Sequence, residues 1–201
     1  MFNLIRRDVI IQKRQLLTFI PFILVFIIFD MSPAFIFVVA SIFIPFNTFG
    51  YDEKTETNIL LNSLPYTRKE IIASRYLGAI VYMIISIAIT SLALWVFNKP
   101  FTMTDIAIGI GLFLLFVALS FPVFYIFKPG YLIHVVLISF ILLAGLGPHL
   151  AQFLIEHVTA FNHFLNTTPT STIYTAAAVG ILVIYGISWG LTTVIYERKV
   201  F

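Results

Sequence analysis

The chain has 201 residues, of which 60% are hydrophobic and only 10% are charged, with a net charge of +3 and no cysteine. A soluble domain carries about 25% charged residues, so the composition excludes an ordinary water-soluble protein and favours several segments that lie in lipid. A sequence without cysteine also excludes disulfides and thiolate metal sites.

Residues 1–14 predict a helix that lies along the membrane surface. Phe2, Ile5 and Val9, continued by Leu16, form an apolar stripe beside basic residues, as an interfacial helix requires. The same basic residues could begin a signal peptide, but no small-x-small cleavage site follows Asp30. We therefore expect an uncleaved first span.

Six apolar stretches then predict an all-α, polytopic membrane protein with six transmembrane helices, in one transmembrane domain that covers residues 1–201. Each stretch has the roughly 20 residues that a helix needs to cross a bilayer. Pro122 predicts a kink in the fourth of them. The predicted spans are 15–31, 33–50, 76–97, 105–127, 131–149 and 173–196.

The basic residues are divided unevenly between the two sides of this predicted membrane. Of the twelve, only Lys99 lies on the side opposite the termini. Cytoplasmic loops of membrane proteins are enriched in Lys and Arg, so both termini are predicted to be cytoplasmic. The basic residues on that side are Arg6, Arg7, Lys13, Arg14, Lys54, Arg68, Lys69, Arg75, Lys128, Arg198 and Lys199.

Residues 51–71 are the longest polar interruption of the chain. A short helix is predicted to begin at Asp52 or Thr55, with the Glu53 and Glu56 carboxylates near its N-terminus. Pro65 ends it, because the residue before a proline avoids helical geometry.

A second helix is predicted to begin at Thr67 and to continue into the third span. Thr67 and Glu70 have the spacing of a capping box, and Tyr66 and Ile71 have that of a hydrophobic staple. Arg68 and Lys69 lie in its first turn, where the helix dipole disfavours cations. That cost is tolerable if they face anionic lipid head groups or an acidic partner. Residues 51–71 therefore either dock a partner or form a cytoplasmic loop that only lies against the lipid head groups.

The spans contain few residues that could carry chemistry. No Asp, Glu, Lys or Arg lies deep in the spans, and His134 lies near an interface. Ion-coupled carriers usually need ionisable groups at mid-membrane, so this distribution disfavours a carrier but does not exclude one. Residues 186–190 spell G-x-S-x-G, but a nucleophilic serine needs a strand-to-helix turn. The two glycines instead favour close packing of membrane helices.

Two further patterns fall short of a binding motif. Lys54 and Thr55 resemble the end of a phosphate-binding loop that lacks its glycines. His149, Glu156, His157 and His163 precede the last span without the spacing of an established zinc motif. The chain is thus expected to bind no cofactor or metal and to be no enzyme.

The stretch "YDEK…LLNSLPYTRKEIIASRYLG" resembles the cytoplasmic segment between the second and third spans of type-2 ABC-transporter permeases whose ATPase is a separate polypeptide. The sequence pattern covers residues 50–78, and the six-span architecture covers the whole chain. The resemblance implies that residues 51–71 form a coupling helix region, which sits in a groove on the ATPase. The implied coupling residues are Asp52, Glu53, Glu56, Leu60, Leu61, Asn62, Ser63, Leu64, Pro65, Arg68, Lys69 and Glu70.

The resemblance also implies partners and a location. It implies two cytoplasmic ABC ATPase subunits that carry ATP and Mg, a second permease subunit that is identical or related, and a bacterial plasma membrane. Residues 1–14 would correspond to the family's interfacial N-terminal helix, and residues 150–172 would form an extracellular or re-entrant segment. No nucleic acid is expected as a partner.

Within the family, the chain looks closest to the permease subunits of the staphylococcal phenol-soluble modulin exporter. This implies export of amphipathic or hydrophobic peptides. Three other classes stay open: an ion-coupled secondary carrier, a small intramembrane enzyme that uses His134 or Ser188, and an assembly or immunity protein that binds a partner without transport.

Overall fold

In the computed structural model, the described part of the chain comprises residues 19–54, 66–126 and 169–198, with the isolated positions 137, 138, 141, 145, 146, 149, 152, 153 and 156 between them. These described residues form helices and short turns and include no strand, which confirms the all-α prediction. The principal elements are a helix Phe19–Ile28, α2 (Pro33–Lys54), α4 (Arg68–Val96), α5 (Met103–Ile126) and α8 (Thr170–Arg198).

Three of these helices are long and apolar enough to cross a membrane: α4, α5 and α8. They correspond to the third, fourth and sixth predicted spans. Phe19–Ile28 and the Pro33–Phe43 part of α2 are apolar but shorter than a bilayer requires. Most of the fifth predicted span, 131–149, lies outside the described residues.

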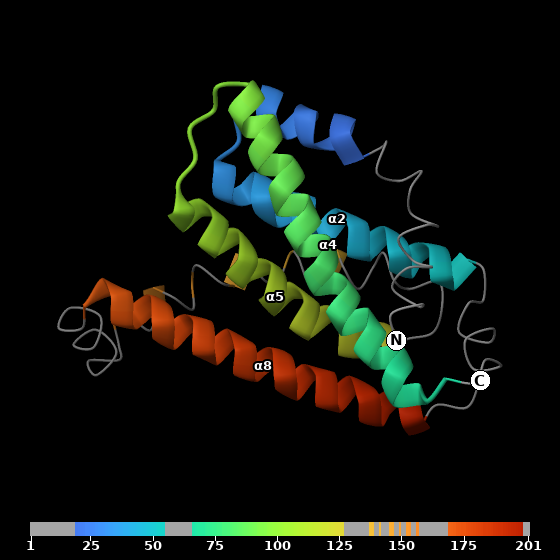
Figure 1. Cartoon of the computed structure of the whole chain (residues 1–201). Helices are drawn as coiled ribbons and strands as arrows, with labels where there is room; N and C mark the ends of the chain where they lie inside the picture. Colours follow the sequence, from blue (N-terminus) through green and yellow to red (C-terminus); the bar gives the residue numbers. More distant parts are fainter. Residues whose placement is uncertain are drawn as a thin grey trace.

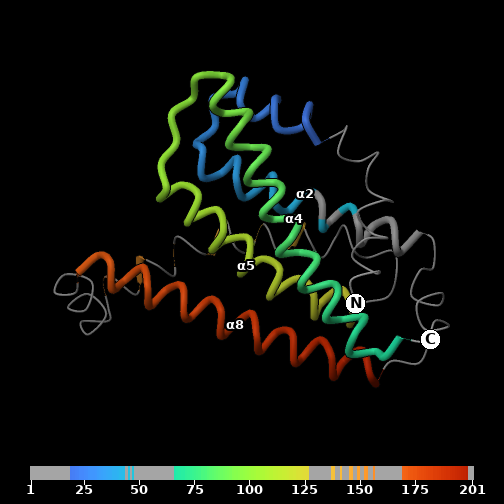
Figure 2. The backbone as a smooth tube through the Cα atoms, viewed as in Figure 1, coloured from blue at the N-terminus to red at the C-terminus, as the bar shows by residue number. Residues whose placement is uncertain are grey.

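The helices run back and forth between two ends of the molecule (Figure 1). The helix Phe19–Ile28 and α4 run in one direction, whereas α2, α5 and α8 run in the other, as the tube in Figure 2 also shows. We call the end with the Phe29–Ser32 turn, the α4–α5 turn and the start of α8 the Asp30 end. We call the opposite end, where α4 begins and α8 finishes, the Arg68 end.

Packing places α5 between α2 and α8, while α4 contacts the same two helices and touches α5 much less. The larger apolar cluster joins α4, α5 and α8 through side chains such as Ile72, Val117 and Tyr196. The smaller one joins the helix Phe19–Ile28, α2 and α4 through side chains such as Phe19 and Leu94. The two clusters hold the helices together across their lengths.

α2 and α5 approach each other closely at Gly109. A Cβ atom built on Gly109 would lie 2.7 Å from the Cβ of Phe37, nearer than real Cβ atoms approach. Phe37 is fully buried and meets Phe101 edge-on at 5.7 Å between ring centroids. Only glycine therefore permits this spacing.

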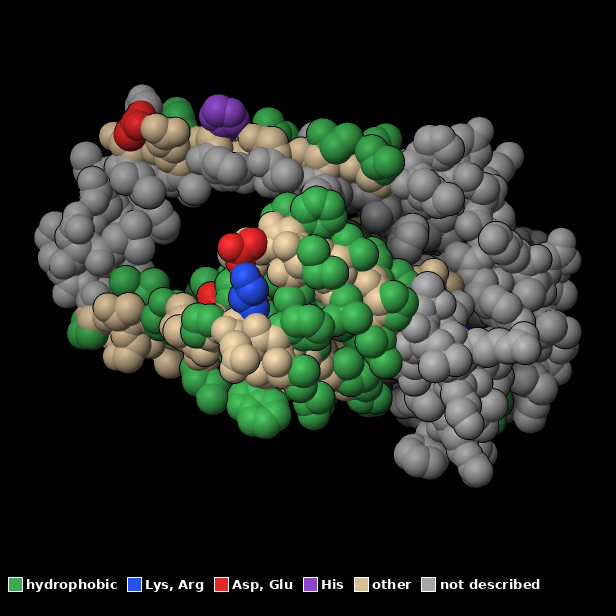
Figure 3. Space-filling view, turned by 90° about the horizontal axis from the view of Figure 1, so that it is seen from above, with side chains coloured by type: hydrophobic (Ala, Val, Ile, Leu, Met, Phe, Trp, Pro, Cys, Tyr) green, Lys and Arg blue, Asp and Glu red, His purple; other side chains and the backbone are tan. Residues whose placement is uncertain are grey.

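The turns at the Asp30 end are joined by an ion pair. Asp30 and Asn98 have φ values of 56° and 52°, a left-handed conformation that Asp and Asn tolerate better than most residues. The Lys99 Nζ donates to Asp30 Oδ1 across the two turns. The Asp30 carboxylate thus balances the charge of Lys99. In the view from above in Figure 3, hydrophobic side chains make up most of the described surface around such charged groups.

Candidate functional site

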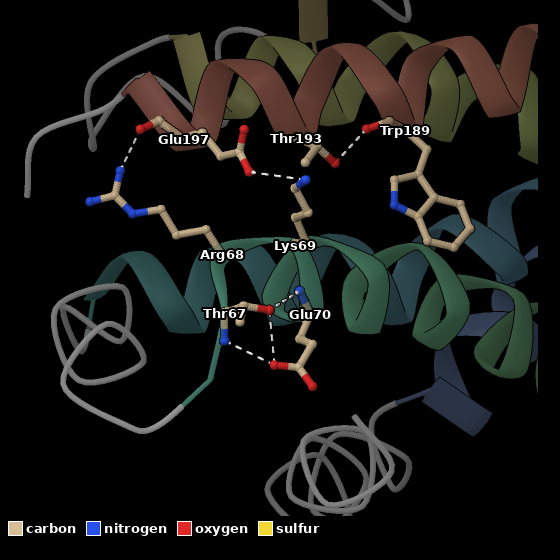
Figure 4. A network of polar contacts seen from close by, with 7 residues as sticks. All are labelled: Thr67, Arg68, Lys69, Glu70, Trp189, Thr193 and Glu197. Carbon is tan, nitrogen blue, oxygen red and sulfur yellow. Dashed lines mark hydrogen bonds and ion pairs between the residues drawn. The ribbon is translucent and has the colours of Figure 1, made fainter.

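The predicted capping box is present at the start of α4. The Thr67 backbone N–H donates to Glu70 Oε2 at 2.9 Å, and the Glu70 N–H donates to Thr67 Oγ1 at 3.2 Å (Figure 4). The bonds from the Thr67 backbone and side chain hold the pKa of the Glu70 carboxyl below its ordinary value. Glu70 is therefore ionised at neutral pH, beside the positive end of the helix dipole.

Apolar packing supports the same cap. Tyr66 packs, partly buried, against the larger apolar cluster, and that cluster contains the buried Ile71. Both residues of the predicted hydrophobic staple therefore belong to the same apolar surroundings. Polar and apolar contacts therefore both stabilise the start of α4.

Arg68 contacts the C-terminal end of α8. Its guanidinium Nη1 donates to the backbone carbonyls of Glu197 at 2.6 Å and Tyr196 at 3.3 Å. A contact of Arg68 with anionic lipid or an acidic partner stays a prediction. The last carbonyls of a helix lack intrahelical partners, and a cation there is favoured by the dipole. The C-terminus of α8 thus offsets the cost of a cation in the first turn of α4.

Lys69 supplements this contact only weakly. Its Nζ lies 3.9 Å from Glu197 Oε1, and its side chain is 75% exposed. An exposed pair of this kind contributes about 0–1 kcal/mol. Of these two basic residues, Arg68 therefore makes the closer contacts between the ends of α4 and α8 (Figure 4).

A second junction between helices starts from a proline in α5. Pro122 lies inside this helix and has no N–H to donate to the carbonyl of Ala118, four residues earlier. Ser188 of α8 takes the place of the missing donor, since its Oγ donates to the Ala118 carbonyl at 2.6 Å. A side chain from α8 thus supplies the hydrogen bond that the backbone of α5 lacks at Ala118.

Tyr76 extends the junction to α4. Its buried hydroxyl lies 2.8 Å from Ser188 Oγ and 2.7 Å from Thr192 Oγ1, and its carbonyl accepts a bond from the Tyr185 hydroxyl at 2.9 Å. One set of buried polar contacts therefore joins α4, α5 and α8. Such bonds are favoured in an apolar interior, where an unpaired hydroxyl would be costly.

Aromatic rings enclose this hydroxyl set. The Tyr76 ring stacks on Trp189 at 5.7 Å between centroids and 9° between planes, and meets Phe121 and Tyr185 edge-on at 5.0 and 5.2 Å. Ser188 is only 4% exposed. Because its proton is given to a carbonyl, this serine has the surroundings of a packing residue and not those of a nucleophile.

The expected close packing at the neighbouring glycines is not seen within the described chain. A Cβ atom on Gly186 or Gly190 would meet no atom within 4 Å.

The predicted helix start at Asp52 is wrong. α2 continues without a break from Pro33 to Lys54, so Asp52 and Glu53 belong to its last turn. Residues 46–54 contain no proline, so the helix of the second span continues through the first polar residues, 51–54. A start at Thr55 falls outside the described residues, as do Glu56, Leu60, Leu61, Asn62, Ser63, Leu64 and Pro65.

The histidine cluster receives no support from the part of the chain that is described. His149 and Glu156 are both exposed, and the described residues contain no group of three or more potential ligands that could hold a metal ion. His134, His157 and His163 lie outside those residues.

Sequence reasoning missed the Tyr76 junction, although two local signals for it exist. Ser188 and Thr192 are four residues apart and so share one face of α8. Pro122 marks a free carbonyl on α5. What the sequence does not contain is the pairing of these two signals with each other and with Tyr76.

Comparison with known proteins gives one match. The family described as "ABC-2 family transporter protein" matches residues 3–197. No curated protein and no solved structure is significantly similar to the chain. The match covers the described helices, except the last residue of α8, and the polar stretch between α2 and α4.

Proposed function

Because the chain belongs to the ABC-2 family of transporter proteins, and is therefore a multi-pass permease component that works with ABC ATPase subunits, we propose that it couples ATP hydrolysis on separate ATPases to export of an amphipathic or hydrophobic substrate. The observation that carries this proposal is the built junction at the Arg68 end. There a capping box between Thr67 and Glu70 stabilises the start of α4, and Arg68 joins α4 to the end of α8.

The proposed topology has six spans, cytoplasmic termini and an interfacial helix at residues 1–14. Helix direction supports it, since α5 and α8 run the same way (Figure 1). The chain between Ile126 and Thr170 must then return to the Asp30 end, as a fifth span at 131–149 would do. The Arg68 end would face the cytoplasm, because basic residues concentrate there.

The proposed coupling element is residues 51–71, between α2 and α4. Two cytoplasmic ATPase subunits would dock on this element, one on each of two permease subunits, and they would hold the ATP and Mg. This chain would bind no cofactor of its own. Docking there is favoured by position, since both flanking helices enter the helical bundle directly.

The proposed substrate is a cytolytic peptide of the phenol-soluble modulin type, and the proposed site is a bacterial plasma membrane. Support comes from the resemblance and from the chemistry of the spans. Residues 76–96, 106–126 and 173–196 contain no charged side chain. Such surroundings suit an amphipathic helix better than an ion or a sugar.

The test is co-purification of the full chain with its ATPase in nanodiscs. We expect Glu56→Ala, Leu60→Ala, Leu64→Ala to insert normally but to lose the ATPase and the associated ATP hydrolysis. The matched control changes the same residue types elsewhere: Glu156→Ala, Leu92→Ala, Leu112→Ala, all at exposed positions. The control variant should keep both the bound ATPase and the ATP hydrolysis.

Two results would contradict the proposal. One is an unchanged chain that never binds an ATPase, and the other is a loss of binding that the control variant shares. Transport that follows an ion gradient without any ATPase would instead support the carrier class.

A further inference from the structure

We propose that Arg68 and Tyr76 fasten α8 to α4 at two levels, so that a movement delivered by residues 51–71 reaches α8 as well as α4. The proposal rests on the proposed coupling role of that segment. It adds the path by which the movement leaves it, and it assigns Tyr76 and Thr192 as positioning residues.

The first reason is the separation along the chain. α4 follows the coupling segment directly, but the carbonyls that Arg68 holds are 128 and 129 residues further on. The end of α8 therefore receives movement from the segment only through contacts in space. The Arg68 guanidinium is such a contact, and it bonds to backbone atoms that move with the whole helix.

The second reason is that the hydroxyl protons around Tyr76 have a fixed order. Ser188 gives its proton to the Ala118 carbonyl, so Tyr76 must donate to Ser188. Tyr76 then accepts from Thr192, because each hydroxyl has one proton to give. The order Thr192, Tyr76, Ser188, Ala118 satisfies every member and crosses three helices.

The third reason is mechanical. Arg68 and Tyr76 are eight residues apart on α4, about 12 Å along its axis. One point of attachment would let α8 pivot or slide on α4, whereas two points at this spacing oppose both motions. A slide of α8 would break several bonds together and leave the Ala118 carbonyl unpaired in an apolar interior, which is costly. The two helices therefore move as one body.

Distances between spin labels test the fastening directly, and the cysteine-free chain makes labelling simple. Labels go on Leu77→Cys in α4 and Val194→Cys in α8, both exposed positions. In the unchanged background we expect one narrow distance, which is the same without nucleotide and with ATP trapped on the ATPase.

The variants come with matched controls. Tyr76→Phe and Thr192→Val remove contacts between helices. Thr193→Val removes the same kind of hydroxyl from the next position, where Thr193 Oγ1 donates only to the Trp189 carbonyl within α8 (Figure 4). For the other junction, Arg68→Gln is compared by the labelled distance alone with Lys99→Gln, which removes a cation that pairs with Asp30 at the opposite end.

Tyr76→Phe, Thr192→Val and Arg68→Gln are expected to broaden the distance distribution, and the two control variants are not. In the complete complex, Tyr76→Phe is expected to leave the ATPase bound. It is also expected to reduce, several-fold, the transport of a fluorescent amphipathic helical peptide per ATP hydrolysed. A variant that lost only stability would lower protein yield and leave the ratio of transport to hydrolysis unchanged.

The proposal is overturned if the labelled distance shifts with ATP in the unchanged chain, or if the controls broaden it equally. It is also overturned if transport per ATP in Tyr76→Phe equals that of the unchanged chain. If no ATPase binds at all, the proposed function itself has failed. The distances in the isolated chain then still decide whether α8 is fastened to α4.

Discussion

Replacing Gly109 with alanine tests the close contact between α2 and α5. The new Cβ would lie 2.7 Å from Phe37 Cβ and 3.7 Å from the Phe37 carbonyl carbon. Ordinary contacts begin at 3.4 Å, so the two helices would have to separate by about 0.7 Å, the difference between 3.4 and 2.7 Å. Rotation of the Phe37 ring gives no relief, because Cβ is fixed to the backbone.

The size of the effect follows from two opposing contributions. Overpacking of a tight core typically costs about 1–3 kcal/mol, and an unyielding backbone contact belongs in the upper part of that range. Alanine regains about 1 kcal/mol of helix propensity over glycine. We therefore expect Gly109→Ala to lower stability by about 1–2 kcal/mol net.

The assay is thermal unfolding in detergent at one fixed heating rate, since unfolding of such proteins is often irreversible. For a chain of this size the net loss corresponds to a fall in Tm of about 2–8 °C. Gly78→Ala is the matched control, because its Cβ would meet Tyr82 at an ordinary 3.8 Å. The reasoning is refuted if Gly109→Ala raises Tm as Gly78→Ala is expected to do.

Two more predictions concern single hydrogen bonds. Ser188→Ala leaves the Ala118 carbonyl unpaired and is expected to lower stability by about 1–3 kcal/mol. A Pro122→Ala background restores an N–H for that carbonyl, so there the fall in Tm caused by Ser188→Ala should be smaller. Equal falls in both backgrounds would contradict the pairing of Ser188 with Ala118. Thr67→Ala removes the cap and is expected to cost about 0.5–2 kcal/mol. Because the folded pKa of Glu70 is lowered, the cap contributes above the unfolded pKa and is lost as pH falls through the folded pKa. An acid titration of Tm should therefore show a smaller loss in Thr67→Ala than in the unchanged chain.

Local signals in the sequence determined the class of the protein and the start of α4. Apolar length and scarce charge predicted membrane helices, three of which the structure supports. The spacing of Thr67 and Glu70 predicted the capping box that is present. These predictions succeed because a hydrophobic stretch or a helix cap involves residues within a few positions of one another. The interacting residues can therefore be recognised from their spacing alone.

Three contacts were decided by the tertiary structure alone. Arg68 binds the end of α8, Ser188 serves the carbonyl freed by Pro122, and Lys99 pairs with Asp30. The partners in these contacts are 129, 70 and 69 residues apart. A single sequence shows which groups need a partner. Here they are a cation in the first turn of a helix, a carbonyl four residues before a proline, and the one basic residue on the side of the membrane opposite the termini. Which partner each one finds depends on how the helices pack, because many hydroxyls and carbonyls would satisfy the same need.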